Sequence, residues 1–236
     1  MRMVRFAPEE YYHVYNRGIE KRTVFLGPKD YERFLSLLYL CNSKTRIHRS
    51  DFFQKDYIEI FSIERGERLV DIGAFCLMSN HFHLLLRERV EGGISAFMQK
   101  ITTAYTMYFN KKNNRSGSLF QGVFKAEHCN NDRYLNYLFA YIHLNPVLDR
   151  DSDTYQTYTK EEIMIAKESL ISYRYSSFLE YLMPRNRPEQ VILNTEEFPE
   201  YFKDTSFEDF VDNWLLYYQK LSRRSLDNNT TETVSE

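Results

Sequence analysis

Asn-His-Phe-His-Leu-Leu, residues 80–85, is the stretch that decides the fold of this chain. It lies in an apolar run of the kind that forms a buried strand. Side chains alternate between the two faces of a strand, so His81 and His83 point to the same face. Two imidazoles side by side supply half of a metal site, although they also occur as hydrogen-bonded core residues. A second set of functional side chains is needed to decide between a metal site and a pair of core histidines.

A helical pattern near residue 140 supplies that second group. Within Tyr-Ile-His-Leu-Asn-Pro (141–146), Tyr141 and Asn145 stand four residues apart and therefore share one helix face. Pro146 predicts the end of this helix. His143 points away from that face, which favours a structural or DNA-contacting role over metal ligation. The alternatives are a core role for Tyr141 and a cap or turn role for Asn145.

The remaining pattern predicts an α+β protein. The predicted strands follow one another too closely for crossover helices throughout, so an antiparallel sheet packed with helices fits better than a doubly wound parallel sheet. We expect strands at Glu10–Asn16, Tyr57–Ile63, Leu69–Met78, His81–Arg87 and Val123–His128, the second and third as a hairpin, and helices from Pro28, over Ile94–Lys112, from Asn131 or Asp132, over Lys160–Leu170 and over Phe207–Leu221.

The domain organisation is predicted from shifts in composition. The chain has 236 residues, enough for one core with an appended element. A polar segment at 149–159 predicts a boundary between a catalytic domain at 1–150 and a helical C-terminal extension at 151–222. Residues 223–236 are polar and are predicted to form a disordered tail. Residues 42–56 are predicted to be a loop or an insertion.

Composition narrows the environment and the partners. The net charge is −2, so global charge does not indicate a nucleic-acid partner, but residues 99–125 are basic and contain no Asp or Glu. Three Cys without CxxC spacing and no signal peptide favour a reducing cytoplasm. No window approaches the roughly 20 apolar residues of a membrane span. Most of the many aromatic residues are expected in the core, a few near the basic segment being available for base stacking.

The two imidazoles and the Tyr141–Asn145 face together predict phosphodiester chemistry. A divalent ion held by two imidazoles and one amide oxygen keeps positions open for substrate. This donor set suits Mn²⁺ or Mg²⁺, with Zn²⁺ as the alternative. A phenol beside such an ion becomes a competent nucleophile. Its attack exchanges one phosphodiester for another and needs no ATP, in agreement with the absence of a GxxxxGK[ST] loop.

Five stretches resemble a known family, the single-tyrosine HUH transposases, and within it the REP-associated tyrosine transposases. HxH alone is weak evidence, but HxH followed by the Tyr-Ile-His-Leu-Asn-Pro motif is strong. The stretches stand in the expected order and span about three-quarters of the chain. They are Tyr-His-Val-Tyr-Asn-Arg-Gly (12–18), Ala-Phe-Cys-Leu-Met-Ser-Asn-His-Phe-His-Leu-Leu-Leu-Arg (74–87), Gly-Ser-Leu-Phe-Gln-Gly-Val-Phe-Lys (117–125), Tyr-Leu-Phe-Ala-Tyr-Ile-His-Leu-Asn-Pro (137–146) and Tyr-Arg-Tyr-Ser-Ser-Phe (173–178).

The resemblance implies a ferredoxin-like HUH endonuclease fold and a specific set of roles. His81 and His83 match the metal ligands, Asn145 the polar third ligand, and Tyr141 the nucleophile that forms a 5′-phosphotyrosine on single-stranded DNA. The resemblance further implies that the protein binds a DNA hairpin beside the cleavage site, and it suggests a homodimer as the assembly. Val123 departs from the family, which often has Arg there. The expected DNA-binding residues are Lys111, Lys112, Arg115 and Lys125, with Arg17 and Lys21 as a second group.

Two other functions remain open at this point. One is a domesticated nucleic-acid-binding regulator with a dormant site, which would bind hairpins but not nick them. The other is a metallohydrolase of small phosphodiesters, which would turn over without a covalent adduct. The leading prediction is a metal-dependent DNA nickase and strand transferase of the cytoplasm, associated with the nucleoid when bound to DNA.

Overall fold

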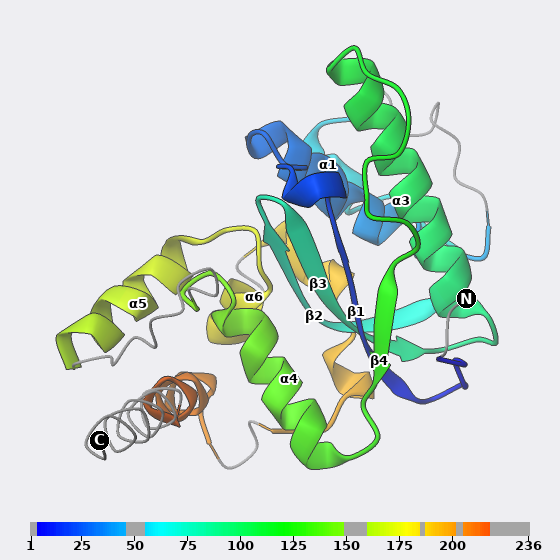
Figure 1. The fold of residues 1–236 in the computed structure, drawn as a ribbon. Helices are drawn as coiled ribbons and strands as arrows, with labels where there is room; N and C mark the ends of the chain where they lie inside the picture. Colours follow the sequence, from blue (N-terminus) through cyan, green and yellow to red (C-terminus); the bar gives the residue numbers. More distant parts are fainter. Residues whose placement is uncertain (1–3, 46–54, 149–159, 185–186, 202–204, 218–236) are drawn as a thin grey trace, which may run out of the picture.

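A four-stranded antiparallel sheet forms the centre of the protein (Figure 1). The computed structural model describes residues 4–45, 55–148, 160–184, 187–201 and 205–217. The strand order is β2-β3-β1-β4, so the strand that carries the histidine pair lies inside the sheet. This confirms the α+β class. The strands are β1 (Tyr11–Arg17), β2 (Val70–Met78), β3 (His81–Glu88) and β4 (Lys125–His128).

Helices cover both faces of the sheet (Figure 1). One face packs against α1 (Pro28–Leu40) and α3 (Gly93–Lys112), and the other against α4 (Asp132–Leu144). Because both faces are covered, β2 and β3 are apolar along most of their length rather than strictly alternating. The other elements are η1 (Ile19–Lys21), α2 (Tyr57–Ile60), α5 (Lys160–Ser172), α6 (Phe178–Leu182), η3 (Pro188–Ile192), η4 (Thr195–Glu197) and a helix at 207–217.

The predicted hairpin between Tyr57–Ile63 and Leu69–Met78 is wrong. Tyr57–Ile60 forms the short helix α2, which begins at a capping box made by Asp56 and Glu59. In such a box each side chain accepts a hydrogen bond from the other residue's backbone N–H, which stabilises a helix start over a strand. The strand that pairs with β2 in a hairpin is β3, through the turn at Ser79 and Asn80.

Strand β2 contains a bulge that changes which side chains face α4. The pairing with β3 shifts between Ile72 and Ala74, so Gly73 is an extra residue. Ile72 and Phe75 both lie in the core on the α1 and α3 face, whereas Ala74 and Cys76 lie under α4. A Cβ atom on Gly73 would lie 2.6 Å from the Phe198 ring, so the bulge requires glycine.

Helix α4 is held against the sheet at both ends. Its N-cap, Asn131, accepts a hydrogen bond from the Tyr134 backbone N–H at 2.8 Å. Near its C-terminus, His143 Nε2 lies 2.8 Å from Ser177 Oγ, and Ser177 also bonds to the backbone of Phe75 on β2. Complete burial lowers the pKa of His143 to about 3, so this imidazole is neutral and structural, which is one of the two roles predicted for it. The Tyr-Arg-Tyr-Ser-Ser-Phe stretch thus fastens α4 to the edge strand.

The C-terminal elements pack on α4 and not as a separate core. Residues of α5, of α6 and of the helix at 207–217 share one apolar cluster with α4. The predicted boundary at 149–159 and the predicted tail at 223–236 lie outside the described residues, and the division at residue 150 stays a prediction. Within the part of the chain that the structure describes, no helix is both long and apolar enough to cross a membrane.

A buried carboxyl group in this region predicts a pH-dependent stability. Burial raises the pKa of Glu180 to about 7, although Arg187, with Nη1 3.3 Å from Oε1 of Glu180, acts to lower it. The folded state therefore binds this proton more tightly than the unfolded chain. The resulting stability is complete below about pH 4.5 and is lost as the pH rises through 7. We expect the free energy of unfolding to fall by up to about 3 kcal/mol over this interval.

Urea unfolding at a series of pH values measures this effect. The Glu180→Gln variant should show a flatter profile, with its largest stability gain over the native chain above pH 7. Glu196→Gln, at an exposed position, is the matched control and should leave the profile unchanged. Identical profiles for the native chain and Glu180→Gln would contradict the assignment.

Candidate functional site

The site lies on the face of the sheet that α4 covers. His81 and His83 come from β3 and point to that face, because Phe82 and Leu84 between and beyond them belong to the opposite core. Their rings lie 5.0 Å apart between centroids and are almost perpendicular, at 87°. His83 is buried, whereas His81 at the start of the strand is half-buried. The alternation of the strand therefore places the two imidazoles together, as predicted.

Each of these imidazoles has its Nδ1 atom engaged. His81 Nδ1 lies 2.6 Å from Oδ1 of Asn80, and because this oxygen only accepts, Nδ1 carries the proton. His83 Nδ1 lies 2.8 Å from Nε2 of His13. If His83 donates in that bond, both rings present the lone pair of Nε2, which is the arrangement that metal-binding histidines adopt when a neighbour fixes their tautomer.

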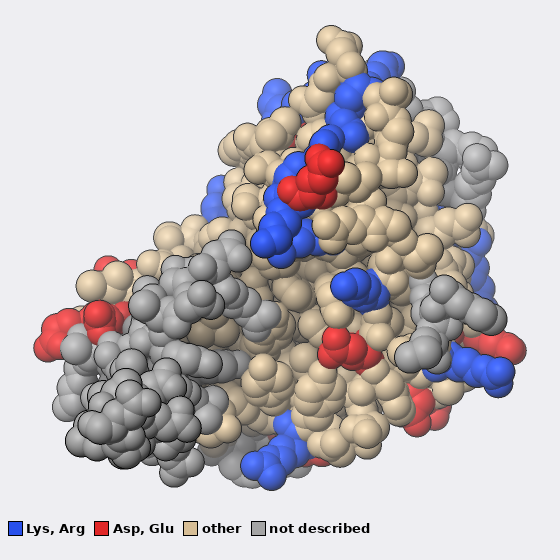
Figure 2. All heavy atoms as spheres, in the orientation of Figure 1, with Lys and Arg blue, Asp and Glu red and all other residues tan. Residues whose placement is uncertain are grey.

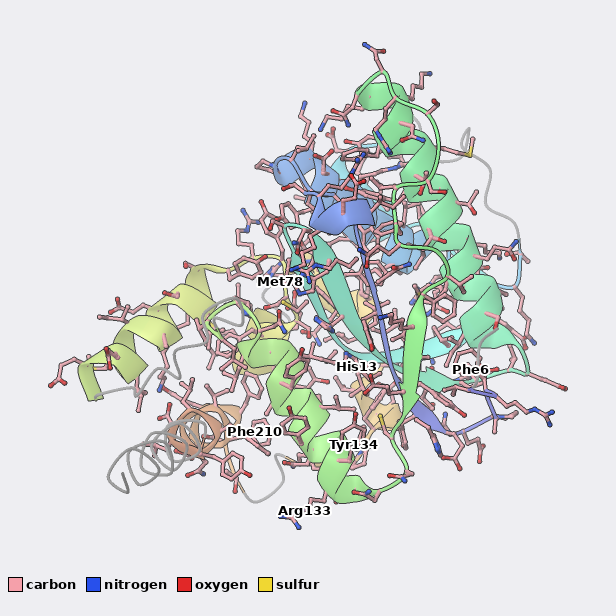
Figure 3. All side chains as sticks on the ribbon, in the orientation of Figure 1. Phe6, His13, Met78, Arg133, Tyr134 and Phe210 are labelled. Carbon is pink, nitrogen blue, oxygen red and sulfur yellow. The ribbon has the colours of Figure 1, made fainter. Side chains whose placement is uncertain are left out.

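His13 is the residue that the sequence prediction missed. It lies on β1 and is 5% exposed, and its ring stacks near that of His83 with centroids 5.0 Å apart. Figure 3 shows His13 on the side of the sheet that faces α4. A signal was present in the sequence, since Tyr11, His13 and Tyr15 alternate with Tyr12 and Val14 and so share one strand face. The pairing of β1 with β3 that makes this face part of the site is a long-range contact.

Tyr141 approaches the histidines from α4. Its ring centroid lies 5.4 Å from that of His83 and 5.9 Å from that of His13, both in edge-to-face geometry. The small side chains of Ala74 and Cys76 lie in the same cluster beneath the helix. Tyr141 is 5% exposed. A single chain thus brings the predicted nucleophile to its own histidine pair.

Asn145 follows Tyr141 by one helical turn and ends α4 before Pro146. It is 3% exposed, and its Nδ2 atom has no hydrogen-bond partner among the described residues. A buried N–H donor without a partner is costly, so this amide nitrogen is placed to donate to an acceptor such as a phosphoryl oxygen. No three His, Cys, Asp or Glu side chains in the described ranges are placed to share a metal ion. Two imidazoles and an amide oxygen, with water or substrate, are the donors this chain can offer, and they suit Mg²⁺ or Mn²⁺.

A carboxylate lies beside the site on β4. Glu127 accepts hydrogen bonds from the hydroxyl groups of Tyr15 and Tyr134, each at 2.9 Å. Burial acts to raise the pKa of Glu127, but these two bonds lower it below its usual value. Burial and the bond to Glu127 raise the pKa of Tyr15 to about 12. Tyr15 therefore stays a neutral phenol, which leaves Tyr141 as the candidate nucleophile next to the histidines.

The predicted DNA-binding residues form two neighbouring groups at one end of the sheet. The loop after α3 is joined to β1 and η1, because the Gln121 N–H donates to the Arg17 carbonyl at 2.8 Å and the Ile19 N–H to that of Leu119 at 3.0 Å. Lys21, Lys111 and Lys125 are exposed. Figure 2 shows Lys and Arg atoms in a strip over η1 and the C-terminal end of α3, interrupted by acidic atoms.

Three of the six are engaged within the protein or half-buried. Lys112 Nζ forms an ion pair with the buried Asp30 at 2.6 Å. Arg115 donates to Asn110 Oδ1 at 2.5 Å and to the Ser118 carbonyl at 3.0 Å. Arg17 is half-buried, and its Nε atom has no hydrogen-bond partner in the described part of the chain. Lys112 and Arg115 thus also hold the end of α3 and its loop.

Comparison with known proteins agrees with this architecture. Residues 31–145 match the family model described as Transposase IS200 like. None of the curated proteins compared with the chain is significantly similar to it. A similar solved structure is that of "the REP associates tyrosine transposase bound to a REP hairpin", with 12% sequence identity and a TM-score of 0.50, covering 80% of this chain and 88% of the other. At that identity the likeness shows the shared fold. Residues 31–145 are thus similar to the IS200-like transposases, in agreement with the predicted resemblance, and the chain shares its fold with a REP-associated tyrosine transposase.

Proposed function

We propose that this protein cleaves single-stranded DNA beside a hairpin and transfers the strand, using Tyr141 as nucleophile and a divalent metal ion at His81 and His83. The observation that carries the proposal is the packing of the Tyr141 ring against His83, with centroids 5.4 Å apart, in one chain. A phenol at that position serves no purpose for DNA binding alone, which favours the enzyme over the dormant regulator.

The site residues have three proposed tasks, which are binding the metal ion, orienting the Tyr141 hydroxyl and attacking the phosphodiester. His81 and His83 would hold the ion through Nε2, with the Asn145 amide oxygen as a third donor. When bound, Mg²⁺ or Mn²⁺ withdraws charge from a phosphoryl oxygen and favours ionisation of a nearby phenol. The edge-to-face packing of Tyr141 against His13 and His83 restricts its ring, so its hydroxyl oxygen is aimed before the substrate arrives.

The proposed reaction conserves one phosphodiester. The Tyr141 oxygen forms a bond to phosphorus while the bond from phosphorus to the 3′ oxygen breaks. The phenolic proton is lost, the 3′ oxygen gains a proton, and the strand end stays attached to Tyr141 through its 5′ phosphate. Attack by another 3′ hydroxyl reverses these changes and joins two strands, so that no nucleotide cofactor is consumed.

The hairpin is the part of the proposal that rests on the structural neighbour, which is bound to a REP hairpin. The exposed lysines of η1, α3 and β4 would contact its phosphates, and binding should weaken steeply with salt. Among these residues Lys21, Lys111 and Lys125 are the most available. A homodimer stays a prediction.

Incubation of the full chain with a pool of single-stranded hairpin DNAs and Mn²⁺ tests the function. We expect a protein–DNA adduct that survives denaturation. The DNA strands recovered from this adduct should be enriched in particular sequences of the pool. Hairpin binding without nicking would support the regulator, and nicking with turnover but no adduct would support the metallohydrolase.

His13 supplies a prediction about the metal. If its Nε2 accepts the proton of His83 Nδ1, it holds the His83 ring with Nε2 facing the ion. The His13→Ala variant should bind Mn²⁺ about 10- to 100-fold more weakly, as is typical when such a supporting residue is lost. Mn²⁺ titration by electron paramagnetic resonance measures this directly. His13→Gln, whose amide oxygen can accept the same proton, should recover part of the affinity, and unchanged affinity in His13→Ala would refute the role.

A further inference from the structure

A groove lined with aromatic side chains lies beside the site. It has a volume of about 490 Å³ and runs between the first turns of α4 and the helix at 207–217. Tyr134 and Tyr137 line it from α4, and Trp214 and Tyr217 from the other helix. Figure 3 shows Tyr134 and Arg133 at the N-terminal part of α4. Neither the metal nor the basic strip uses these residues.

The rings form a series that leads to the proposed nucleophile. The Tyr134 and Tyr137 rings are stacked with centroids 6.1 Å apart, and those of Tyr137 and Tyr141 with centroids 6.0 Å apart and planes 23° apart. Trp214 meets Tyr137 edge to face at 5.7 Å. The groove therefore begins one helical turn from Tyr141.

The rings are both available and fixed. Tyr217 is 46% exposed, and Tyr134, Tyr137 and Trp214 are half-buried, so each ring keeps accessible surface. The hydrogen bond from Tyr134 to Glu127 and the contact between Trp214 and Tyr137 limit their rotation. Fixed, accessible aromatic faces are the surfaces on which unpaired bases stack, and they lose little entropy on binding.

The charges of the groove favour bases over phosphates. Its charged residues are Asp132 and Arg133, which cancel formally. Asp132 accepts a hydrogen bond from the Tyr201 hydroxyl at 2.9 Å, and Arg133 is exposed without an ion pair among the described residues. A neutral groove gains little from counterion release, in contrast to the basic strip over η1 and α3.

We propose that this aromatic groove binds unpaired bases of the DNA strand that flanks the scissile phosphate. The inference rests on the proposed function, because the strand has to pass Tyr141. The contact is stacking on Tyr137, Trp214 and Tyr217, so it tolerates different bases and holds the strand in register with the nucleophile.

Trp214 is the only tryptophan of the chain, so its fluorescence reports on the groove. The full chain in EDTA, where no cleavage occurs, is titrated with single-stranded dT15 and with an abasic strand of the same length. We expect dT15 to quench the fluorescence and the abasic strand to bind through its phosphates without quenching. Quenching by both strands, or by neither, would overturn the proposal.

Substitutions separate stacking from electrostatics. Trp214→Ala should weaken dT15 binding, measured by anisotropy of the labelled strand, by about 5- to 100-fold, and Trp214→Phe by much less. Tyr217→Ala, at a position where the side chain is 46% exposed, should weaken dT15 binding in the same direction. Neither of these two variants should change how the binding constant depends on salt. Lys111→Ala should lower the slope of log K against log salt concentration by about one.

The outcomes distinguish this proposal from the proposed function. Unchanged affinity in Trp214→Ala and Tyr217→Ala would refute the groove even if the native chain forms an adduct with hairpin DNA. Loss of affinity in both variants in a chain that forms no adduct would support the groove and refute the tyrosine chemistry.

Discussion

The Tyr141→Phe variant should form no covalent adduct with DNA and should bind the same DNA within about twofold of the native chain. Only the hydroxyl oxygen is removed, and the ring that packs against His13 and His83 is retained. Loss of a nucleophile lowers the rate by several orders of magnitude, so we expect at least about a thousand-fold decrease in cleavage. Adduct yield on a denaturing gel and binding by anisotropy measure the two effects side by side.

Tyr137→Phe is the matched control for this experiment. Tyr137 lies one turn before Tyr141 on the same helix, and its ring stacks on that of Tyr141 at 6.0 Å. Because stacking needs the ring and not the hydroxyl, this variant should form the adduct normally. An adduct in Tyr141→Phe, or its loss only in Tyr137→Phe, would assign the nucleophile elsewhere.

Replacing His83 with Ala should abolish metal-dependent cleavage and Mn²⁺ binding while the DNA complex persists. The side chain is buried beside Tyr141, and no other described residue can take its place between His13 and His81. We expect cleavage to fall at least about 100-fold, and the His81→Ala variant to behave alike. Cleavage assays across a Mn²⁺ series, with titration of the bound metal, provide the measurement.

His128→Ala is the histidine control. His128 is exposed on β4, with its Nε2 atom 2.8 Å from Oε2 of Glu10, and it is outside the histidine cluster. Its loss should leave both Mn²⁺ affinity and cleavage close to those of the native chain. Undiminished cleavage by His83→Ala in metal-free buffer would rule out the metal mechanism and leave a purely protein-based one.

The sequence predicted the parts of the site that depend on local periodicity. Alternation along β3 gave the His81 and His83 pair, and the four-residue spacing gave the Tyr141 and Asn145 face. It did not give His13, because the pairing of His13 with this face depends on contacts between residues about 70 positions apart. It also predicted a strand where α2 stands, because aromatic and β-branched residues outweighed the capping box at Asp56 and Glu59.

The basic residues show a different reason for an incomplete prediction. Lys111 and Lys112 are adjacent and chemically alike, yet Lys112 forms an ion pair with the buried Asp30 of α1, 82 positions earlier. A charge count along the sequence treats both as available to DNA. Only the packing of α1 on α3 distinguishes Lys112, which neutralises a buried carboxylate, from Lys111, which stays exposed to solvent.

The bulge at Gly73 gives the site a dependence on residues that never touch DNA or metal. If Gly73 were instead part of a regular strand without the bulge, the phase of the residues after it would reverse, so that Phe75 and Leu77 would lie beneath α4 in place of Ala74 and Cys76. Helix α4 would then lie farther from the sheet, and Tyr141 would move away from the histidines although no residue of the site itself is changed. The distance between α4 and the sheet is thus set by two small side chains and one glycine, and the proposed chemistry depends on it.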